Sequence, residues 1–388
     1  MNINIYLSCL QSLHEYNIPS FSFWEVYFKK GIEEGGYTWC ETPQVDWAKG
    51  LTLSRKDEIE RWKVETWELV ISDIKSKLTK SKIDIFLCYL YPQQIDDSSI
   101  KTIQNLGIPC VNFFCDNIRD FTRVPNEFKI FDLIWVPELS AIPMYKKEHI
   151  KCIHLPMPMW INKKSIYFKQ EESESIIFIG SKCILRANLL YDAINLGLDM
   201  VIRGEGWEIT SSTLSNKQPS RSFYKQVKNQ FETLSKGGIA ALYQKIHRRL
   251  YPPFDPPLEF FKKFVRPKPN FEDYNKLTRN SKICIGINRV DTLRNPLKKP
   301  LAYSRLRDIE APMLGACYLT EWTEDIEAFY EIGKEIETYK SADELVQKVN
   351  WLSNDVQKRN SIRTFGQKRA LNNHCVKKSI EIIFSTLK

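Results

Sequence analysis

Short apolar runs alternate with longer amphipathic stretches along the first 155 residues. The patterns at 23–35, 58–78 and 97–106 predict helices, and the first of these is expected to end at Gly35. Apolar runs of strand length stand at 2–10, 84–90, 110–114, 130–136 and 153–155. Apolar strands that alternate with helices are typical of an open parallel sheet covered on both faces.

The same alternation begins again near residue 176. Strands are predicted at 176–179, 200–203, 282–287, 316–320 and 335–339, and helices at 187–196, 304–314, 342–352 and over the last 30 or so residues. The fold class is therefore α/β, with two Rossmann-like parallel-sheet domains. Because ligands bind outside the carboxyl ends of the strands in such sheets, we expect the site in a cleft between the two domains.

The predicted domains have definite bounds. A first Rossmann-like domain covers 1–160, a charged segment at 161–175 is interpreted as a linker, and a second Rossmann-like domain covers 176–355. Within the second domain, 208–280 is interpreted as a basic helical insertion, because the distance between neighbouring strands far exceeds an ordinary loop. The helices of 356–388 are expected to pack back on the first domain.

Composition excludes several classes of protein. There is no run of about 18 apolar residues, so no spanning helix is expected. The N-terminus lacks a basic region of the kind that opens a signal peptide, and the ten cysteines form no CxxC pair. We therefore expect a cytoplasmic protein with free thiols. The five histidines show no metal-ligand spacing, so no metal site is expected.

The formal net charge of +9 belongs to one segment. Residues 217–268 hold twelve Lys and Arg but three acidic residues, and the rest of the chain is balanced. Part of this segment has apolar residues at helical spacing, as in helices that lie on an anionic membrane. The alternative is a helical hairpin with a solvated basic face. Binding of nucleic acid is a third interpretation of this charge. No recognisable nucleic-acid-binding module accompanies it, so no nucleic-acid partner is expected.

The stretch RDIEAPMLGACYLTE (307–321) combines charge with a predicted helix end and strand. The carboxylate of Glu310 is able to accept two hydrogen bonds from a ribose diol, as acidic residues do in dinucleotide-binding folds. Arg307, one turn earlier, suits a phosphate. The alternative is a surface helix with an Arg–Glu pair at i, i+3.

This stretch, with GKEIETYKSADELVQKV downstream, resembles the C-terminal signature of GT-B-fold glycosyltransferases, and in particular their spore-maturation-like subgroup. FFCDN and FDLIWVPE in the first half, and FIGS in the second, extend the resemblance. It covers roughly residues 80–120, 130–140, 175–207 and 280–375. The resemblance implies a GT-B fold, with the nucleotide-sugar donor on the second domain and the acceptor on the first.

Particular residues match the family pattern. Glu310 matches the glutamate that binds the nucleotide ribose, Gly180 and Ser181 match the glycine turn that faces the diphosphate, and Arg186 matches a basic residue that neutralises it. The family generally works without a bound metal or other cofactor, so cationic side chains stabilise the departing nucleoside diphosphate. Many retaining members carry a second glutamate eight positions earlier, where this chain has Ala302. The stereochemistry therefore stays open.

An inverting reaction requires a general base near the acceptor hydroxyl. Asp116, directly after the strand at 110–114, is the first candidate, with helix capping or turn formation as the alternative. His14, in the loop after the first strand, is the second, with a solvated loop histidine as its alternative. Asp46 is a third and weaker candidate. Glu138, after the strand at 130–136, suits a contact with the sugar or the acceptor, with a structural role as the alternative. Trp207 suits stacking on a base or sugar, or closure of the core.

These observations predict a metal-independent glycosyltransferase that moves a sugar from a nucleotide-sugar donor to a glycan or lipid-linked acceptor. Segment 217–268 would then provide peripheral contact with the inner face of an anionic membrane. Two alternatives remain: a GT-B-fold nucleotide-sugar epimerase, and a non-enzymatic basic scaffold that binds lipid or nucleic acid.

Overall fold

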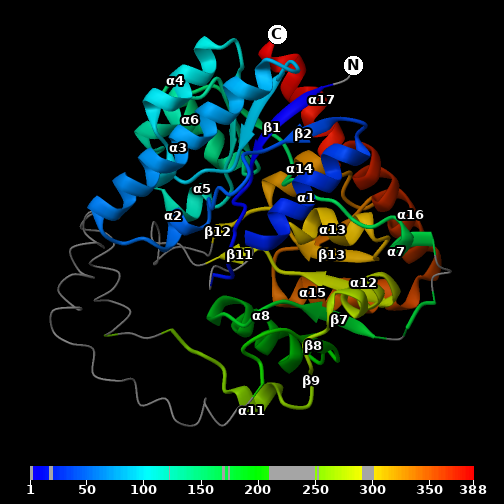
Figure 1. Cartoon of the computed structure of the whole chain (residues 1–388). Coiled ribbons are helices and arrows are strands. Elements are labelled where there is room, and N and C mark those ends of the chain that lie inside the picture. Colours follow the sequence, from blue (N-terminus) through cyan, green and yellow to red (C-terminus); the bar gives the residue numbers. More distant parts are fainter. Residues whose placement is uncertain are drawn as a thin grey trace. The chain divides into compact units, whose positions relative to one another are not determined.

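The computed structural model describes residues 3–16, 21–121, 123–167, 171–173, 175–208, 250, 253–290 and 301–388 (Figure 1). The chain divides into two compact units, one formed by residues 1–117, 123–160 and 372–388, the other by 118–122 and 161–371. No helix among the described residues is long and apolar enough to cross a membrane. Most of the interpreted basic insertion (209–249 and 251–252) lies outside the described residues.

The first unit contains a six-stranded parallel sheet of order β2-β1-β3-β4-β5-β6. Its elements are β1 (Asn4–Ser8), α1 (Phe21–Glu34), β2 (Thr38–Cys40), α2 (Lys49–Thr52), α3 (Lys56–Leu78), β3 (Ile85–Cys88), α4 (Asp97–Asn105), β4 (Cys110–Phe113), β5 (Leu133–Val136), α6 (Ile142–Lys147), β6 (Cys152–His154) and α17 (Val376–Leu387). The predicted strands and helices of this half are therefore confirmed, and the short strand β2 adds to them.

Aromatic side chains fill the core of the first unit. Phe113 of β4 lies 5.3 Å from Trp24 and 5.2 Å from Trp135, measured between ring centroids. Such pairs each contribute about 0.5–1.5 kcal/mol beyond the burial of their area. The last helix, α17, packs on α1, where a Cβ at Gly31 would lie 2.5 Å from a methyl carbon of Val376. Gly31 therefore allows the two helices to approach closely.

The second unit contains a second parallel sheet, of order β14-β13-β10-β7-β8-β9. Its elements are α7 (Lys164–Tyr167), β7 (Ile176–Ile179), α8 (Ile184–Asn195), β8 (Val201–Arg203), α11 (Leu258–Phe261), β9 (Val265–Arg266), α12 (Phe271–Asn280), β10 (Ile283–Gly286), β11 (Arg289–Val290), β12 (Leu301–Ala302), α13 (Arg307–Met313), β13 (Tyr318–Glu321), α14 (Glu324–Phe329), β14 (Glu337–Tyr339), α15 (Ala342–Asn354) and, for most of its length, α16 (Val356–Asn373). The helix α5 (Asn117–Asp120) spans a boundary between the units.

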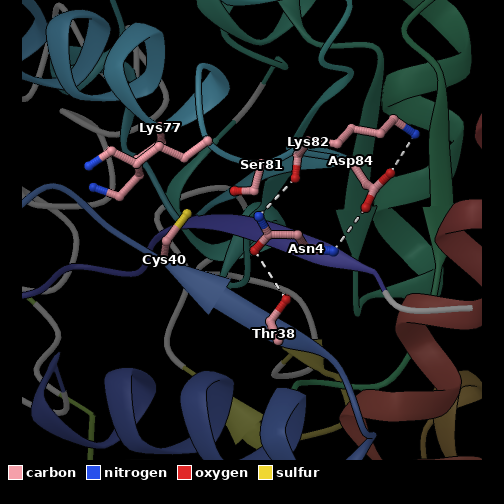
Figure 2. A pocket seen from close by; sticks show the side chains of 8 residues that line it. Asn4, Thr38, Cys40, Lys77, Ser81, Lys82 and Asp84 are labelled. Carbon is pink, nitrogen blue, oxygen red and sulfur yellow. Dashed lines mark hydrogen bonds and ion pairs between the residues drawn. The ribbon is translucent and has the colours of Figure 1, made fainter.

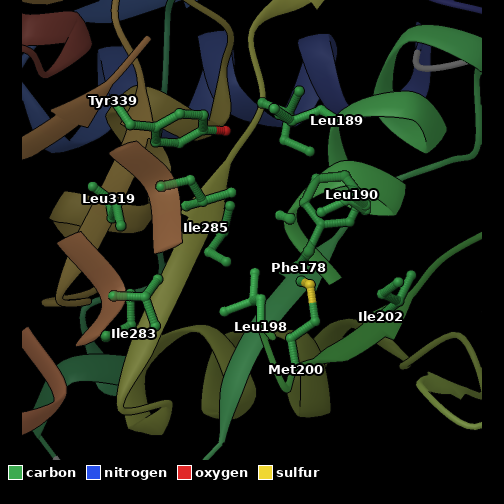
Figure 3. Close-up of a cluster of buried hydrophobic side chains, with 14 of the residues drawn as sticks. Phe178, Leu189, Leu190, Leu198, Met200, Ile202, Ile283, Ile285, Leu319 and Tyr339 are labelled. Atoms are coloured by element: carbon green, nitrogen blue, oxygen red, sulfur yellow. The ribbon is translucent and has the colours of Figure 1, made fainter. Parts of the chain in front are cut away.

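The core of the second unit is mainly aliphatic. Strand residues such as Ile202, Ile285 and Leu319 belong to one buried cluster with Leu189 and Leu190 of α8 (Figure 3). These side chains are all at most 2% exposed, and each contributes roughly 1.5–3 kcal/mol by leaving water. The sheet is therefore a rigid base for the loops at the carboxyl ends of its strands.

The segment interpreted as a linker lies within the second unit. Glu172 forms ion pairs with Arg359 (2.5 Å) and with Arg363, both on α16. The two guanidinium groups are almost fully buried, at 3% and 6% exposed. This part of the segment is consequently tied down, because a buried cation without its partner costs several kcal/mol.

Candidate functional site: the carboxyl edge of the second sheet

The strand order of the second sheet creates a switch point between β7 and β10. In chain order the strands run outwards from β7 to β8 and β9 on one side, and from β10 to β13 and β14 on the other. Ligands of open α/β sheets bind outside the carboxyl ends of the strands at such a point. Gly180 directly follows β7, and Gly286 ends β10.

The turn at Gly180 is locked against the loop after β8. Its N–H donates to the carbonyl of Arg203 (2.8 Å), and its carbonyl accepts from Nε1 of Trp207 (2.8 Å). Trp207 is 1% exposed and packs on Phe178 and Phe261, so it closes the core instead of stacking on a ligand. The N–H of Gly180 is thus occupied by a backbone partner.

Three arginines gather beside this turn. Arg186, in the first turn of α8, donates from Nη1 to the carbonyl of Ser181 (3.0 Å), while its buried Nε has no protein partner. Burial lowers the pKa of Arg186. Cys183 opposes this effect, and the nearby charges of Arg305 and Arg307 add to it. Three cations held together in a partly buried place favour a ligand of high negative charge.

The helix α13 is buried, not on the surface. Its Asp308 is fully buried and accepts from the Tyr318 hydroxyl (2.9 Å), from Thr320 (2.8 Å) and from the Arg305 N–H (2.7 Å). Burial raises the pKa of Asp308 to about 6. Asp308 therefore anchors the start of the helix and fixes the backbone on both sides of Arg307.

The other end of α13 stops at a glycine, as the sequence predicted. Gly315 has a φ of +80°, which an L side chain rarely adopts. The last carbonyls of the helix accept from distant side chains: Leu314 from Arg279 (2.9 Å) and Met313 from Gln367 (3.0 Å). Both ends of the seven-residue helix that carries Glu310 are thus held.

Glu310 is 8% exposed and lies near a neutral tyrosine and a cationic arginine. The hydroxyl of Tyr274, on α12, donates to Oε2 of Glu310. The guanidinium carbon of Arg307 lies 5.0 Å from the centre of the Tyr274 ring, and one of its nitrogens, Nη1, is buried without a partner. Burial disfavours the charge on Arg307, but Tyr274, Cys284 and Glu310 together outweigh it and raise its pKa. The alternative of a solvated Arg–Glu pair is therefore excluded.

Sequence reasoning missed Tyr274 and Arg305. Tyr274 lies 36 residues before Glu310, on a helix whose start is marked by the capping side chain of Asn270. That cap predicts the helix, but no local pattern connects residue 274 with residue 310. Arg305 lies within the helix predicted at 304–314 but precedes α13, and no motif marks it.

In the first unit, Asp116 follows β4 at the carboxyl edge of the sheet. It has a φ of +66°, a conformation that Asp tolerates better than most residues. The neighbouring Asn117 is fully buried, donates to Glu138 (2.5 Å) and accepts from the Tyr145 hydroxyl (2.6 Å). Glu138 is also fully buried, so it serves this network, and Asp116 is the half-exposed carboxylate of the group.

His14 and Asp46 lie in loops of the same unit. His14 is exposed, and its ring stands edge-on to Tyr16 at 6.4 Å. Asp46 accepts from the Tyr16 hydroxyl (2.8 Å) and from the Lys49 N–H (3.0 Å). Asp46 therefore has a structural role at the start of α2, whereas His14 is open to solvent.

One cavity of the first unit, of about 640 Å³, lies away from this edge. It is lined by Asn4, Thr38 and Asp84 at the amino ends of the strands, together with lysines from the end of α3 (Figure 2). Figure 2 shows Asn4 bridging Lys82 and Thr38 across its floor. Within the described ranges, no group of three or more His, Cys, Asp or Glu is able to hold a metal ion. The absence of a metal from the reaction stays a prediction.

Residues 240–385 match a family model described as "Glycosyl transferase-like". No curated protein sequence matches the chain. Among solved structures, a glycosyltransferase from Rickettsia africae aligns at a TM-score of 0.58 and 11% identity, over 100% of this chain and 98% of its own. Sucrose-phosphate synthase from Thermosynechococcus elongatus aligns at 0.54 and 9%, over 100% and 99%, and HepE from Anabaena, in complex with UDP, at 0.52 and 10%, over 100% of both chains.

The fold is GT-B. The match over 240–385 includes Tyr274, Arg307 and Glu310, and so places the family similarity on the part of the chain that carries the candidate site. The predicted resemblance to GT-B glycosyltransferases is thereby confirmed, for the fold over the whole chain and for the family over its C-terminal part. The spore-maturation-like subgroup stays a prediction.

Proposed function

We propose that this GT-B protein is a glycosyltransferase that takes its sugar from a nucleoside diphosphate sugar. The observation that carries the proposal is the cluster of Arg186, Arg305 and Arg307 at the switch point, beside the carboxylate of Glu310. The cations suit a diphosphate, and the carboxylate suits a ribose diol. Structures similar in fold bind such ligands: HepE from Anabaena is known in complex with UDP and with UDP-glucose.

The reaction breaks the bond between the anomeric carbon of the sugar and the diphosphate oxygen. The electron pair of this bond leaves with the nucleoside diphosphate, whose negative charge the arginines stabilise. The hydroxyl oxygen of the acceptor forms the new bond to the anomeric carbon and loses its proton to a base. Asp116 is the base we propose, with His14 as the second candidate.

The acceptor that we propose is a glycan or a lipid-linked saccharide. The proposal of a lipid-linked acceptor rests on the positive charge of segment 217–268. The described part of this segment consists of residue 250 and residues 253–268. Flotation with vesicles of anionic and of neutral lipid tests it. Binding to anionic vesicles that is lost at high salt supports a membrane-bound acceptor, whereas equal or absent binding contradicts it.

Thermal shift with UDP, GDP, ADP and CDP tests the donor site. A ligand of the folded state stabilises it by about 2.7 kcal/mol at a hundredfold excess over its Kd. We expect one diphosphate to raise the Tm of the wild type, and to raise that of Glu310→Ala clearly less. If none of the four shifts the wild type, the proposal is wrong.

Product analysis separates this function from that of an epimerase. With the matching nucleotide sugar, a transferase releases nucleoside diphosphate and does so faster when acceptor is added. An epimerase yields an isomeric nucleotide sugar and releases no nucleotide. Addition of EDTA is expected to leave the rate unchanged.

A further inference from the structure

We propose that Tyr274 is a positioning residue, which holds the carboxylate of Glu310 in the orientation that accepts the ribose diol of the donor. The inference deepens the proposed function and depends on it. It rests on the hydrogen bond from the Tyr274 hydroxyl to Oε2 of Glu310, and on the way in which both partners are fixed.

The direction of this hydrogen bond follows from burial. Burial raises the pKa of Tyr274 well above its usual value, which outweighs the opposing effect of Arg307, and Glu310 raises it further. The hydroxyl therefore keeps its proton at neutral pH and donates it to the carboxylate. A carboxylate has about four acceptor positions, so a bond to Oε2 does not by itself exclude hydrogen bonds from the hydroxyls of a sugar.

The backbone around Tyr274 prevents the hydroxyl from moving away. The helix α12 begins at the side-chain cap of Asn270, which accepts from the Asp273 N–H (2.8 Å). At its other end, Arg279 donates to the carbonyl of Leu314, directly beyond α13. The helix α12 is thus fastened to the end of α13, and Tyr274 faces Glu310 across the contact.

Arg307 completes the arrangement above the ring of Tyr274. Its guanidinium stacks over Tyr274 at 5.0 Å, an attraction of about 0.5–2 kcal/mol for a cation above an aromatic face. The same cation belongs to the arginine cluster that we assign to the diphosphate. Tyr274 therefore contacts Glu310, which we assign to the ribose, and Arg307, which we assign to the diphosphate. Its hydroxyl bonds to Glu310, and its ring contacts Arg307.

Substitution of the hydroxyl alone tests the inference. Tyr274→Phe keeps the ring and its stacking with Arg307, but leaves Glu310 without this donor. The matched control is Tyr330→Phe, which removes another buried hydroxyl, one that donates to the backbone carbonyl of Asp308 on the same helix (2.8 Å). Glu310→Gln reports on the proposed ribose contact itself.

The readout is the preference for ribose over 2′-deoxyribose, which general destabilisation does not change. Kd values are measured by titration calorimetry for UDP, GDP, ADP and CDP and for the 2′-deoxy form of each. For the diphosphate that binds, we expect the wild type to prefer ribose by about tenfold, as one good hydrogen bond to a charged group gives. Tyr274→Phe and Glu310→Gln are expected to reduce this preference at least threefold, and Tyr330→Phe to retain it.

The outcomes separate the inference from the proposed function. If Glu310→Gln loses the preference while Tyr274→Phe retains it, Tyr274 does not position the carboxylate, and the donor site stands. If Glu310→Gln retains the preference, or if no diphosphate binds the wild type, the role of Glu310 in the proposed function is wrong and the inference is wrong with it. An equal loss in Tyr330→Phe would overturn the inference by showing that any disturbance of α13 has this effect.

Discussion

Substitution of Gly204 by alanine should break the turn that faces the proposed diphosphate. Gly204 has a φ of +139°, and a Cβ at this position would lie 2.2 Å from the carbonyl oxygen of Gly180. Ordinary contact begins near 3.4 Å, so the two loops would have to separate by about 1 Å. Both contacting atoms belong to backbone, which yields far less readily than the end of a flexible side chain.

The magnitude follows from two contributions. A left-handed backbone costs an L residue roughly 1–2 kcal/mol, and the stiffer unfolded chain returns about 0.4–1 kcal/mol of this. Separation of the loops would also break the bonds that Gly180 makes with the carbonyl of Arg203 and the indole of Trp207, at about 0.5–1.5 kcal/mol each. We expect Gly204→Ala to lower the free energy of unfolding by about 2–4 kcal/mol.

Gly197→Ala is the matched control. Gly197 lies in the same unit with a φ of +97°, and a Cβ there would meet no atom within 4 Å. This variant therefore measures the backbone cost alone, which we expect to be about 1 kcal/mol or less. Urea denaturation of the full chain gives both free energies, and thermal shift with the nucleoside diphosphate gives the effect on the site.

We expect Gly204→Ala to lose stability and nucleotide binding together, because the displaced turn carries Ser181 and leads into Arg186. Gly197→Ala should bind the nucleotide as the wild type does. If the two variants differ by less than about 0.5 kcal/mol and both bind, the close approach of the two loops is not what holds the turn, and the reasoning is refuted.

Three further predictions concern single charged residues. Arg359 and Arg363, against the opposing effect of burial, lower the pKa of Glu172, so its stabilising effect is present above the unfolded pKa near 4.3 and is lost as pH falls through the folded value. In Glu172→Gln this acid-dependent loss, followed by Tm between pH 3 and 7, should shrink; an unchanged profile contradicts it. Arg186→Ala should weaken nucleoside diphosphate binding about 10- to 100-fold and leave the nucleoside unaffected, as measured by calorimetry; equal losses would refute a phosphate role. Asp116→Asn, which keeps a residue that tolerates positive φ, should lower kcat about 10²- to 10⁴-fold with unchanged donor binding, and a normal kcat would exclude Asp116 as the base.

The central strands could be predicted from the sequence because a strand that is buried on both faces consists of a run of apolar residues. The strands at Ile85–Cys88 and Cys110–Phe113 are fully buried, and each was visible as an apolar run. The edge strand Thr38–Cys40 was not, because it is short and partly exposed and so has no such run. Glu310 was proposed because its helix, Gly315 and the next strand stand next to one another in sequence and resemble the signature of GT-B glycosyltransferases.

What the sequence determined by itself was therefore local: the alternation of strands and helices, the end of α13 at Gly315, and the presence of a carboxylate and an arginine one turn apart. The tertiary structure decided which distant residues meet them. It brought Tyr274 to Glu310, Arg186 to Arg307 and the Gly204 loop to Gly180. The periodicity of the sequence shows only which residues lie on the buried face of a helix or strand. The partners of a side chain are set by the order of the strands and the packing of helices far apart in the chain, which no local pattern records.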